Sequence, residues 1–286
     1  MRPAEWHTKT QPATSVIHRM TQIIAALYHF ETPCGIRELA RYTGLPPSTV
    51  GRLVRDMIPA GLLDRHAGGV TLGLQVFQWG SRAWQPRFPL DAAMPLLTDL
   101  YATTQQTIHL AVLDGADVLY LEILPRLGGP QLPSRVGGRL PAHATGVGKA
   151  LLAASPARVV DELVATGLPS LGPRTIRQPG LLRRQLARVA TTGIAVDHEE
   201  SGPGIVCVAT VIRDTRDNPV AAISAAGWSG KMNVRQVASA VYSTAHAIGR
   251  TLRPAGDGIR CWRPDPSDSI PANPSHRKPK PQPRYE

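Results

Sequence analysis

Residues 36–55, IRELARYTGLPPSTVGRLVR, decide how the first part of this chain folds. Apolar and small residues recur there with helical spacing on both sides of Gly44, and glycine adopts the left-handed backbone of a tight turn at little cost. These predicted core positions are Ile36, Leu39, Ala40, Leu45, Val50 and Leu53. The pattern predicts a helix-turn-helix, whose second helix enters the major groove of DNA.

The segments on either side extend this motif into a domain over residues 14–73. Apolar residues three or four positions apart within residues 16–27 predict a first helix, which Thr14 or Ser15 would cap. This helix supplies the third side of the core that the two shorter helices need.

A wing follows the helix-turn-helix. The helix that begins at Pro46-Pro47 is expected to end at Gly61. Residues 62–73, LLDRHAGGVTLG, then predict two short strands joined by a turn at Ala67–Gly69. The order of three helices and a hairpin indicates a winged helix-turn-helix domain.

The candidate contacts to double-stranded operator DNA lie on the second helix of the motif and on the wing, with one further arginine on the first helix of the motif. They are Arg37, Pro47, Ser48, Thr49, Arg52, Arg55, Arg65 and His66. Arginine suits this role because its guanidinium binds phosphate and guanine in a bidentate manner. For Arg65 and His66, ordinary solvated surface is the alternative interpretation.

The composition of the chain agrees with a polyanionic partner. It has 286 residues and a net charge of +11, with a sequence pI near 10.2. A basic tail alone would explain the same charge.

No apolar run of about 20 residues predicts a membrane span, and polar residues interrupt any N-terminal signal peptide. Three widely separated cysteines predict neither a disulfide framework nor a zinc site, so we expect a cytoplasmic protein without metal or cofactor.

The rest of the chain divides by its pattern into three parts. Residues 74–90 are predicted to form a linker helix, residues 91–254 a second domain, and residues 255–286 a disordered, proline-rich basic tail. In the second domain helices are expected at 91–106 and 233–253 and within 156–193, with strands at 107–113, 118–123, 194–196, 205–212 and 220–226. Antiparallel strands with helices grouped around them indicate an α+β fold.

Four segments of this second domain resemble the IclR family of bacterial transcription regulators. They are LPAHATGVGKALLA (140–153), HLAVLDGADVLYL (109–121), DHEESGPGIVCVATVIRD (197–214) and AAISAAGW (221–228). With the winged unit, the resemblance covers roughly residues 15–253. It departs from the family pattern in its short wing and at Thr210-Val211, where members often carry Pro-Val.

The resemblance implies a regulator in which a GAF-like domain binds a small effector, often a carboxylate or an aromatic catabolite, and changes DNA affinity. It also implies a homodimer or homotetramer. By position, the implied effector contacts are Ala142, Thr145, Gly146, Val147, Asp197, Glu199, Glu200, Cys207 and Ser224. The residues themselves agree in part, because a helix beginning near Gly146–Lys149 would offer free N–H groups to an anion.

Other functions compete for the same residues. A P-loop is excluded, because His143 replaces its first glycine and Ala150 replaces the Ser or Thr that binds magnesium. An enzyme acting on a small molecule, with Cys207 as nucleophile beside His143 and Asp197, is the alternative from a different class. A redox-responsive regulator based on Cys207 is another. For His143 a structural hydrogen bond is the preferred interpretation.

Overall fold

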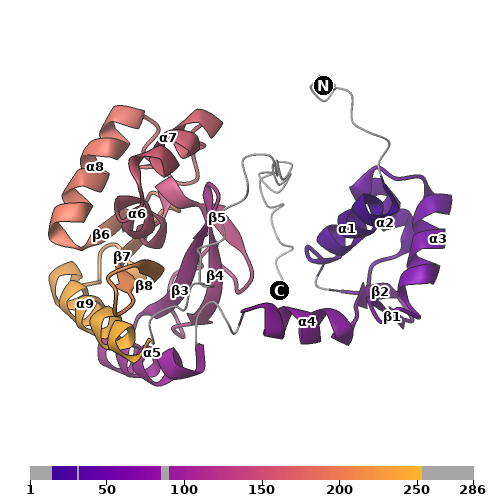
Figure 1. Ribbon diagram of the computed structural model, residues 1–286, viewed down its shortest axis with the longest axis horizontal. Helices are drawn as coiled ribbons and strands as arrows, with labels where there is room; N and C mark the ends of the chain where they lie inside the picture. The colour runs from indigo at the N-terminus through magenta and orange to yellow at the C-terminus, as the bar shows by residue number, and fades with distance from the viewer. Residues whose placement is uncertain (1–14, 31, 85–89, 253–286) are drawn as a thin grey trace. The chain divides into compact units, whose positions relative to one another are not determined.

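The computed structural model describes residues 15–30, 32–84 and 90–252, and these form two compact units. One unit is built from residues up to 84 and the other from residue 90 onward (Figure 1). The proline-rich tail predicted at 255–286 and the possible cap Thr14 lie outside the described residues. No helix within the described ranges is long and apolar enough to cross a membrane.

The first unit is the predicted winged helix-turn-helix. Its elements in chain order are α1 (Val16–Leu27), α2 (Ile36–Thr43), α3 (Pro47–Met57), β1 (Leu63–His66), β2 (Gly69–Leu72) and α4 (Leu74–Trp84). The Ser15 hydroxyl caps α1 by accepting the N–H of His18 at 3.2 Å. Gly44 ends α2 with a φ of 73°, the left-handed turn that its sequence position predicts. Ile23, Leu39, Leu53 and Met57 are buried between the three helices.

Two boundaries in this unit differ from the sequence prediction. Helix α3 ends at Met57 and not at Gly61, because Pro59 has no N–H to continue the helical hydrogen bonds. The turn of the wing contains only Ala67 and Gly68, since Gly69 already pairs with His66 in the hairpin.

The segment before α2 joins the wing. Cys34 forms an antiparallel bridge with Val70, with both N–H to O distances at 3.0 Å. The wing is therefore tied to the start of α2 by main-chain hydrogen bonds.

The second unit has the predicted α+β architecture. Its elements are α5 (Leu90–Thr104), β3 (Thr107–Asp114), β4 (Asp117–Leu124), β5 (Arg139–Pro141), a 3-10 turn (Ala142–Ala144), α6 (Gly146–Ala153), α7 (Ala157–Thr166), α8 (Pro179–Thr192), β6 (Ala195–His198), β7 (Ile205–Arg213), β8 (Pro219–Trp228) and α9 (Val234–Thr251). The strands form one antiparallel sheet in the order β5-β4-β3-β8-β7-β6. Strand β5 has only three residues and was not predicted.

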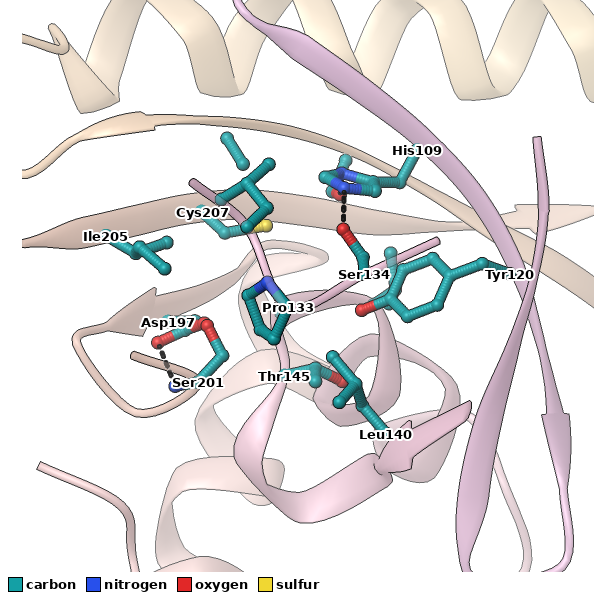
Figure 2. A pocket seen from close by; sticks show the side chains of 15 residues that line it. His109, Tyr120, Pro133, Ser134, Leu140, Thr145, Asp197, Ser201, Ile205 and Cys207 are labelled. Carbon is teal, nitrogen blue, oxygen red and sulfur yellow. Dashed lines mark hydrogen bonds between the residues drawn. The ribbon is translucent and has the colours of Figure 1, made fainter. Parts of the chain in front are cut away.

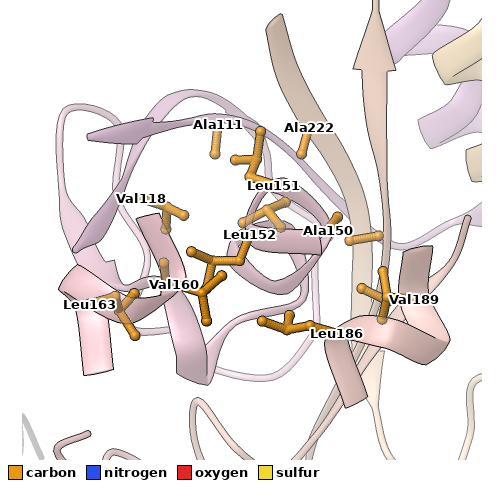
Figure 3. Packing of buried hydrophobic residues seen from close by; sticks show 14 of the residues in the cluster. Ala111, Val118, Ala150, Leu151, Leu152, Val160, Leu163, Leu186, Val189 and Ala222 are labelled. Atoms are coloured by element: carbon orange, nitrogen blue, oxygen red, sulfur yellow. The ribbon is translucent and has the colours of Figure 1, made fainter. Parts of the chain in front are cut away.

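Helices cover the two faces of this sheet (Figure 1). Helices α5 and α9 pack on one face, and α6 packs on the other with α7 and α8 outside it. Figure 3 shows Leu151 and Leu152 of α6 lying between Ala111 and Ala222 of the sheet and the apolar residues of α7 and α8. Because side chains alternate along a strand, every second residue of β3, β7 and β8 points toward α6.

Helix α6 approaches the sheet closely at its first residue. A Cβ atom on Gly146 would lie 3.0 Å from the Cys207 sulfur and 3.3 Å from the Ala209 Cβ atom. A larger residue would push the helix away from β7. This close approach places the beginning of α6 directly over the middle of the sheet.

Candidate functional site

The outer face of α3 carries the polar residues that the sequence analysis selected. Ser48, Arg52 and Arg55 are exposed, whereas Thr49 is half-buried. The opposite face of the same helix is buried, through Val50, Leu53, Val54 and Met57. Arg52 lies 3.9 Å from Asp56 in an exposed i,i+4 pair, which leaves the guanidinium free to exchange partners.

The other selected residues of this unit are also exposed. Pro47 begins α3, Arg37 lies in the first turn of α2, and Arg65 and His66 lie on β1. His66 Nε2 is 3.0 Å from the Thr71 hydroxyl across the hairpin, so its ring is held against the wing. The unit therefore presents one exposed helix face with two arginines and a short wing whose first strand carries Arg65 and His66.

The second unit contains a narrow pocket between the sheet and the beginning of α6. Its floor consists of neighbours on adjacent strands, because Asp197 pairs with Cys207 and Cys207 pairs with Ala226. His109 and Ser224 form another cross-strand pair of the floor. The remaining lining residues are Tyr120, Leu132, Pro133, Ser134, Leu140, Thr145, Gly146, Val147, Ser201 and Ile205.

His109 joins the floor of the pocket to its roof. Its Nε2 atom is 2.8 Å from the Ser134 hydroxyl (Figure 2). Its Nδ1 atom is 3.2 Å from the Ser224 hydroxyl. Burial lowers the pKa of His109 to about 4, so the ring is neutral at neutral pH. The segment 132–134 is thereby held over the pocket by a neutral histidine.

Asp197 is the one carboxylate among the lining residues that the structure describes. Its oxygens accept the Ser201 hydroxyl at 2.6 Å and the Glu200 N–H at 2.7 Å. Burial raises the pKa of Asp197, and these hydrogen bonds oppose that change. No lysine or arginine belongs to the described lining, so the floor offers dipoles and hydroxyls instead of a formal positive charge.

Cys207 belongs to β7, and its sulfur lies against Gly146 at the start of α6. Its side chain is a protonated thiol. Burial, with the nearby charge of Asp197, raises the pKa of Cys207 to about 12. A thiol with such a pKa is a poor nucleophile, because the reactive species is the thiolate.

Helix α6 begins where the sequence analysis placed it. The Thr145 hydroxyl caps it by accepting the Gly148 N–H at 3.1 Å. Thr145, Gly146 and Val147 all line the pocket. The first N–H groups of a helix have no partner within the helix, and the helix dipole favours an anion at this end. The start of α6 is therefore the part of the pocket best suited to a negatively charged oxygen.

Three of the nine selected effector residues lie outside the pocket lining. Ala142 is buried in the core beside α6. The Glu199 carboxylate accepts hydrogen bonds from the Gly204 N–H and the Ser229 hydroxyl, away from the lining. Glu200 points beneath the pocket, where it pairs with a buried lysine.

That lysine is Lys149, whose side chain is fully buried. Its ammonium group forms a short ion pair with Glu200 and donates to the Val196 carbonyl at 2.6 Å and to Gln185 at 3.0 Å. The pair thus joins α6, α8 and the chain around β6. It explains why Glu200 does not contact the pocket.

The structure keeps Asp197 beside Cys207 but places His143 outside the pocket that these two residues line. His143 Nε2 is 3.0 Å from the Pro169 carbonyl, which can only accept, so this nitrogen carries the proton. His143 is not among the residues that line the pocket with Cys207. Its hydrogen bond is the structural role that the sequence analysis preferred.

Several lining residues were not predicted from the sequence, above all His109, Tyr120 and Ser134. The alternation of β3 and β4 carried a signal for the first two, because each lies on the same face as buried small or apolar residues. Ser134 lies in an irregular segment without periodicity, and its sequence carries no comparable signal.

Comparisons with known proteins agree with both units. The family described as bacterial transcriptional regulator IclR C-terminal matches residues 90–250, and the IclR helix-turn-helix domain matches residues 16–67. The transcriptional repressor IclR of Escherichia coli strain K12 is 32% identical over 226 residues, which cover 76% of this chain and 82% of that protein. The HTH-type transcriptional repressor AllR of Klebsiella pneumoniae is 28% identical over 257 residues, covering 88% and 94%.

A solved structure with the same fold contains a small molecule. It is an IclR homolog from Microbacterium hydrocarbonoxydans complexed with 4-hydroxybenzoate, with a TM-score of 0.76 and 29% identity. The match covers 82% of this chain and 98% of that chain. From the two family matches and the relatives, this chain belongs to the IclR family of bacterial transcriptional regulators.

Proposed function

We propose that this protein represses transcription by binding operator DNA through α3 and the wing, and that a small carboxylic acid bound at the start of α6 changes its DNA affinity. The observation that carries the proposal is the combination, in one chain, of an exposed arginine-bearing helix face with a buried polar pocket at a helix N-terminus. Relatives named as repressors support the direction of regulation.

The exposed face of α3 supplies both kinds of DNA contact. Arg52 and Arg55 suit phosphate or guanine, and Ser48 suits either a base edge or a phosphate. Arg65 and His66 on the wing would contact the backbone beside the major groove. Arg37, Pro47 and Thr49 complete the proposed interface.

The pocket supports a small acid as effector. Its lining combines the start of α6 with the polar groups of Cys207, Ser224 and Asp197 and with apolar walls. A carboxylate would accept hydrogen bonds from the first turn of α6, while Asp197 would accept a hydrogen bond from a donor on the ligand. The 4-hydroxybenzoate in the IclR homolog is a molecule of this kind.

The geometry favours binding over catalysis at this site. The Cys207 thiol is protonated, and the His143 ring is engaged with Pro169, so His143 does not serve as the base that would activate this thiol.

We also infer that the protein acts as a homodimer, or as a homotetramer built from dimers. Leu74, Phe77 and Trp79 on α4 expose more than half of their surface. An exposed apolar group of this kind is typical of a contact with another chain. A dimer would present two copies of α3 to the two halves of one operator.

The DNA-binding half of the proposal is tested by fluorescence anisotropy with the DNA regions flanking the gene. Replacing Arg52 with alanine should weaken operator binding by about 1–3 kcal/mol if the guanidinium contacts a base. The matched control is Arg188→Ala, which removes another exposed arginine, from α8 in the other unit. Equal losses in the two variants would mean that only net charge matters, and that α3 is not the reading helix.

The effector half is tested by titrating small acids, including 4-hydroxybenzoate, into the protein with and without operator DNA. If the acid changes operator affinity, the operator must change the affinity for the acid by the same factor. Calorimetry that finds acid binding but no mutual effect would refute regulation by that acid.

A further inference from the structure

Tyr120 places an unpartnered hydroxyl in the pocket. Its side chain is only 5% exposed, and Figure 2 shows the hydroxyl pointing to the middle of the pocket, on the side of Pro133 and Thr145. Within the described part of the chain no group pairs with this hydroxyl, and it is not among the fully enclosed polar atoms that lack a partner, so it reaches the open space of the pocket. A ligand acceptor placed there would give this hydroxyl a direct hydrogen bond in a largely enclosed site.

The backbone holds Tyr120 in this orientation. In the β3–β4 pairing, Ala111 faces Tyr120 and Leu110 faces Glu122, so Leu121 is an extra residue that forms a bulge. The Tyr120 N–H donates to the Gly138 carbonyl at 3.0 Å, and its carbonyl accepts the Gly137 N–H at 2.8 Å. A bulge beside a pocket commonly directs a side chain into it.

Neighbouring side chains leave the hydroxyl no other acceptor. The His109 ring packs beside the Tyr120 ring, with centroids 5.3 Å apart, and both of its nitrogens already face Ser134 and Ser224. Asp197 lies on the opposite side of the pocket in Figure 2 and is engaged with Ser201. Tyr120 is therefore positioned to donate to a bound molecule.

The charges around Tyr120 restrict the chemical group that a bound molecule can place next to the Tyr120 hydroxyl. Burial, with the nearby Cys207 and Asp197, raises the pKa of Tyr120, so the phenol remains a protonated donor. His109 is neutral, and Lys149 is engaged with Glu200 beneath the pocket. Since no cationic side chain belongs to the described lining, a second carboxylate at this end would bury an uncompensated negative charge.

We infer that Tyr120 determines effector specificity by donating its hydroxyl proton to an uncharged oxygen of the ligand. The effector is then a monocarboxylic acid with a hydroxyl, keto or ether oxygen apart from its carboxylate. This inference rests on the proposed function, in which an acid binds at the start of α6.

The test is calorimetric titration of the full chain with two series of acids. One series is benzoate, 4-hydroxybenzoate and terephthalate, and the other is propionate, lactate and malonate. In the series that binds, we expect the hydroxylated monoacid to bind at least about tenfold more tightly than both its parent acid and the diacid, as for other sites that read a hydroxyl.

Tyr120→Phe should remove this selectivity, so that the parent and hydroxylated acids bind within about twofold of each other. The parent acid should keep its wild-type affinity, because the variant loses only one oxygen atom. Tyr242→Phe is the matched control, since Tyr242 is exposed on α9 and outside the pocket, and it should behave as the wild type.

Each other outcome overturns the inference. Binding without preference for the hydroxylated acid, tighter binding of a diacid, or selectivity that survives in Tyr120→Phe would exclude Tyr120 from this role and leave the proposed function intact. If none of the six acids binds, the acid-binding part of the proposed function fails, and the inference fails with it.

Discussion

The two units of this protein place their candidate sites in opposite environments. In the winged unit, Ser48, Arg52 and Arg55 lie on the solvent face of a single helix. In the second unit, residues of all six strands, of the start of α6 and of two connecting segments line the pocket, and most of them are buried. A site on one exposed helix face is separable from the core behind it, whereas the pocket is itself part of the core. Changes at the pocket should therefore alter stability and binding together.

Charge shows the same contrast. The cations of α3 are exposed and available to a partner, and Arg52 makes only a loose pair with Asp56. Lys149 in the second unit is fully buried and committed to Glu200. An exposed pair contributes little to folding, while breaking a buried pair leaves an unpaired charge in the interior.

The largest expected effect is that of removing Lys149. Lys149→Met should lower the free energy of unfolding of the second unit by about 3–5 kcal/mol, because it leaves the Glu200 carboxylate buried without its cation. Chemical denaturation followed by circular dichroism measures this loss.

The double variant Lys149→Met with Glu200→Leu is the control. It should recover most of the lost stability, since replacing both ions with apolar groups removes the unpaired charge. If the double variant is as unstable as the single one, packing and not charge explains the loss. Arg52→Met should leave stability nearly unchanged, which sharpens the contrast between the two units.

A pH effect of intermediate size is expected from His109. Burial lowers its pKa in the folded state to about 4 from an ordinary value of 6.5. Below pH 6.5 the unfolded chain therefore binds a proton that the folded protein does not. Stability should be complete above pH 6.5 and fall as the pH decreases to about 4, by up to ~3 kcal/mol in total from this group.

Comparing wild type with His109→Gln isolates this contribution. Glutamine keeps a polar group near Ser134 but does not titrate, so the variant should lose less stability between pH 6.5 and 4. Parallel curves for the two proteins in that range would show that His109 is not the responsible group. His66, which is exposed on the wing, serves as the control position through His66→Gln.

The smallest expected effect lies in the winged unit. Ser15→Ala should destabilise α1 by about 1 kcal/mol, because the His18 N–H loses its cap. Hydrogen exchange of the α1 amides measures this change, and Ser15→Asp, which retains a capping oxygen, should resemble the wild type. A loss of operator affinity as large as that of Arg52→Ala would contradict the separation of core and DNA-reading face.

Most features that depend on residues close together in the sequence were predicted correctly, whereas several that depend on contacts between distant segments were not. The buried stripe of α3 and the turn at Gly44 depend on residues a few positions apart, so periodicity and backbone preference reveal them. The predicted end of α3 at Gly61 was wrong because the missing N–H of Pro59 outweighs the permissive backbone of glycine. Strand β5 escaped prediction because its three residues are extended only by pairing with β4.

The sequence by itself determined the order of the longer elements, the exposed face of α3 and the position of the α6 N-terminus. Through resemblance it also indicated several pocket residues, such as Cys207 and Ser224. The tertiary structure decided that Glu200 forms an ion pair with Lys149 and does not line the pocket. It also decided that His109 and Tyr120 do line the pocket. Helical periodicity is a property of neighbouring residues and is visible in any single segment. The neighbours of a pocket residue come from strands far apart in the chain, and only the pairing register of the sheet brings them together.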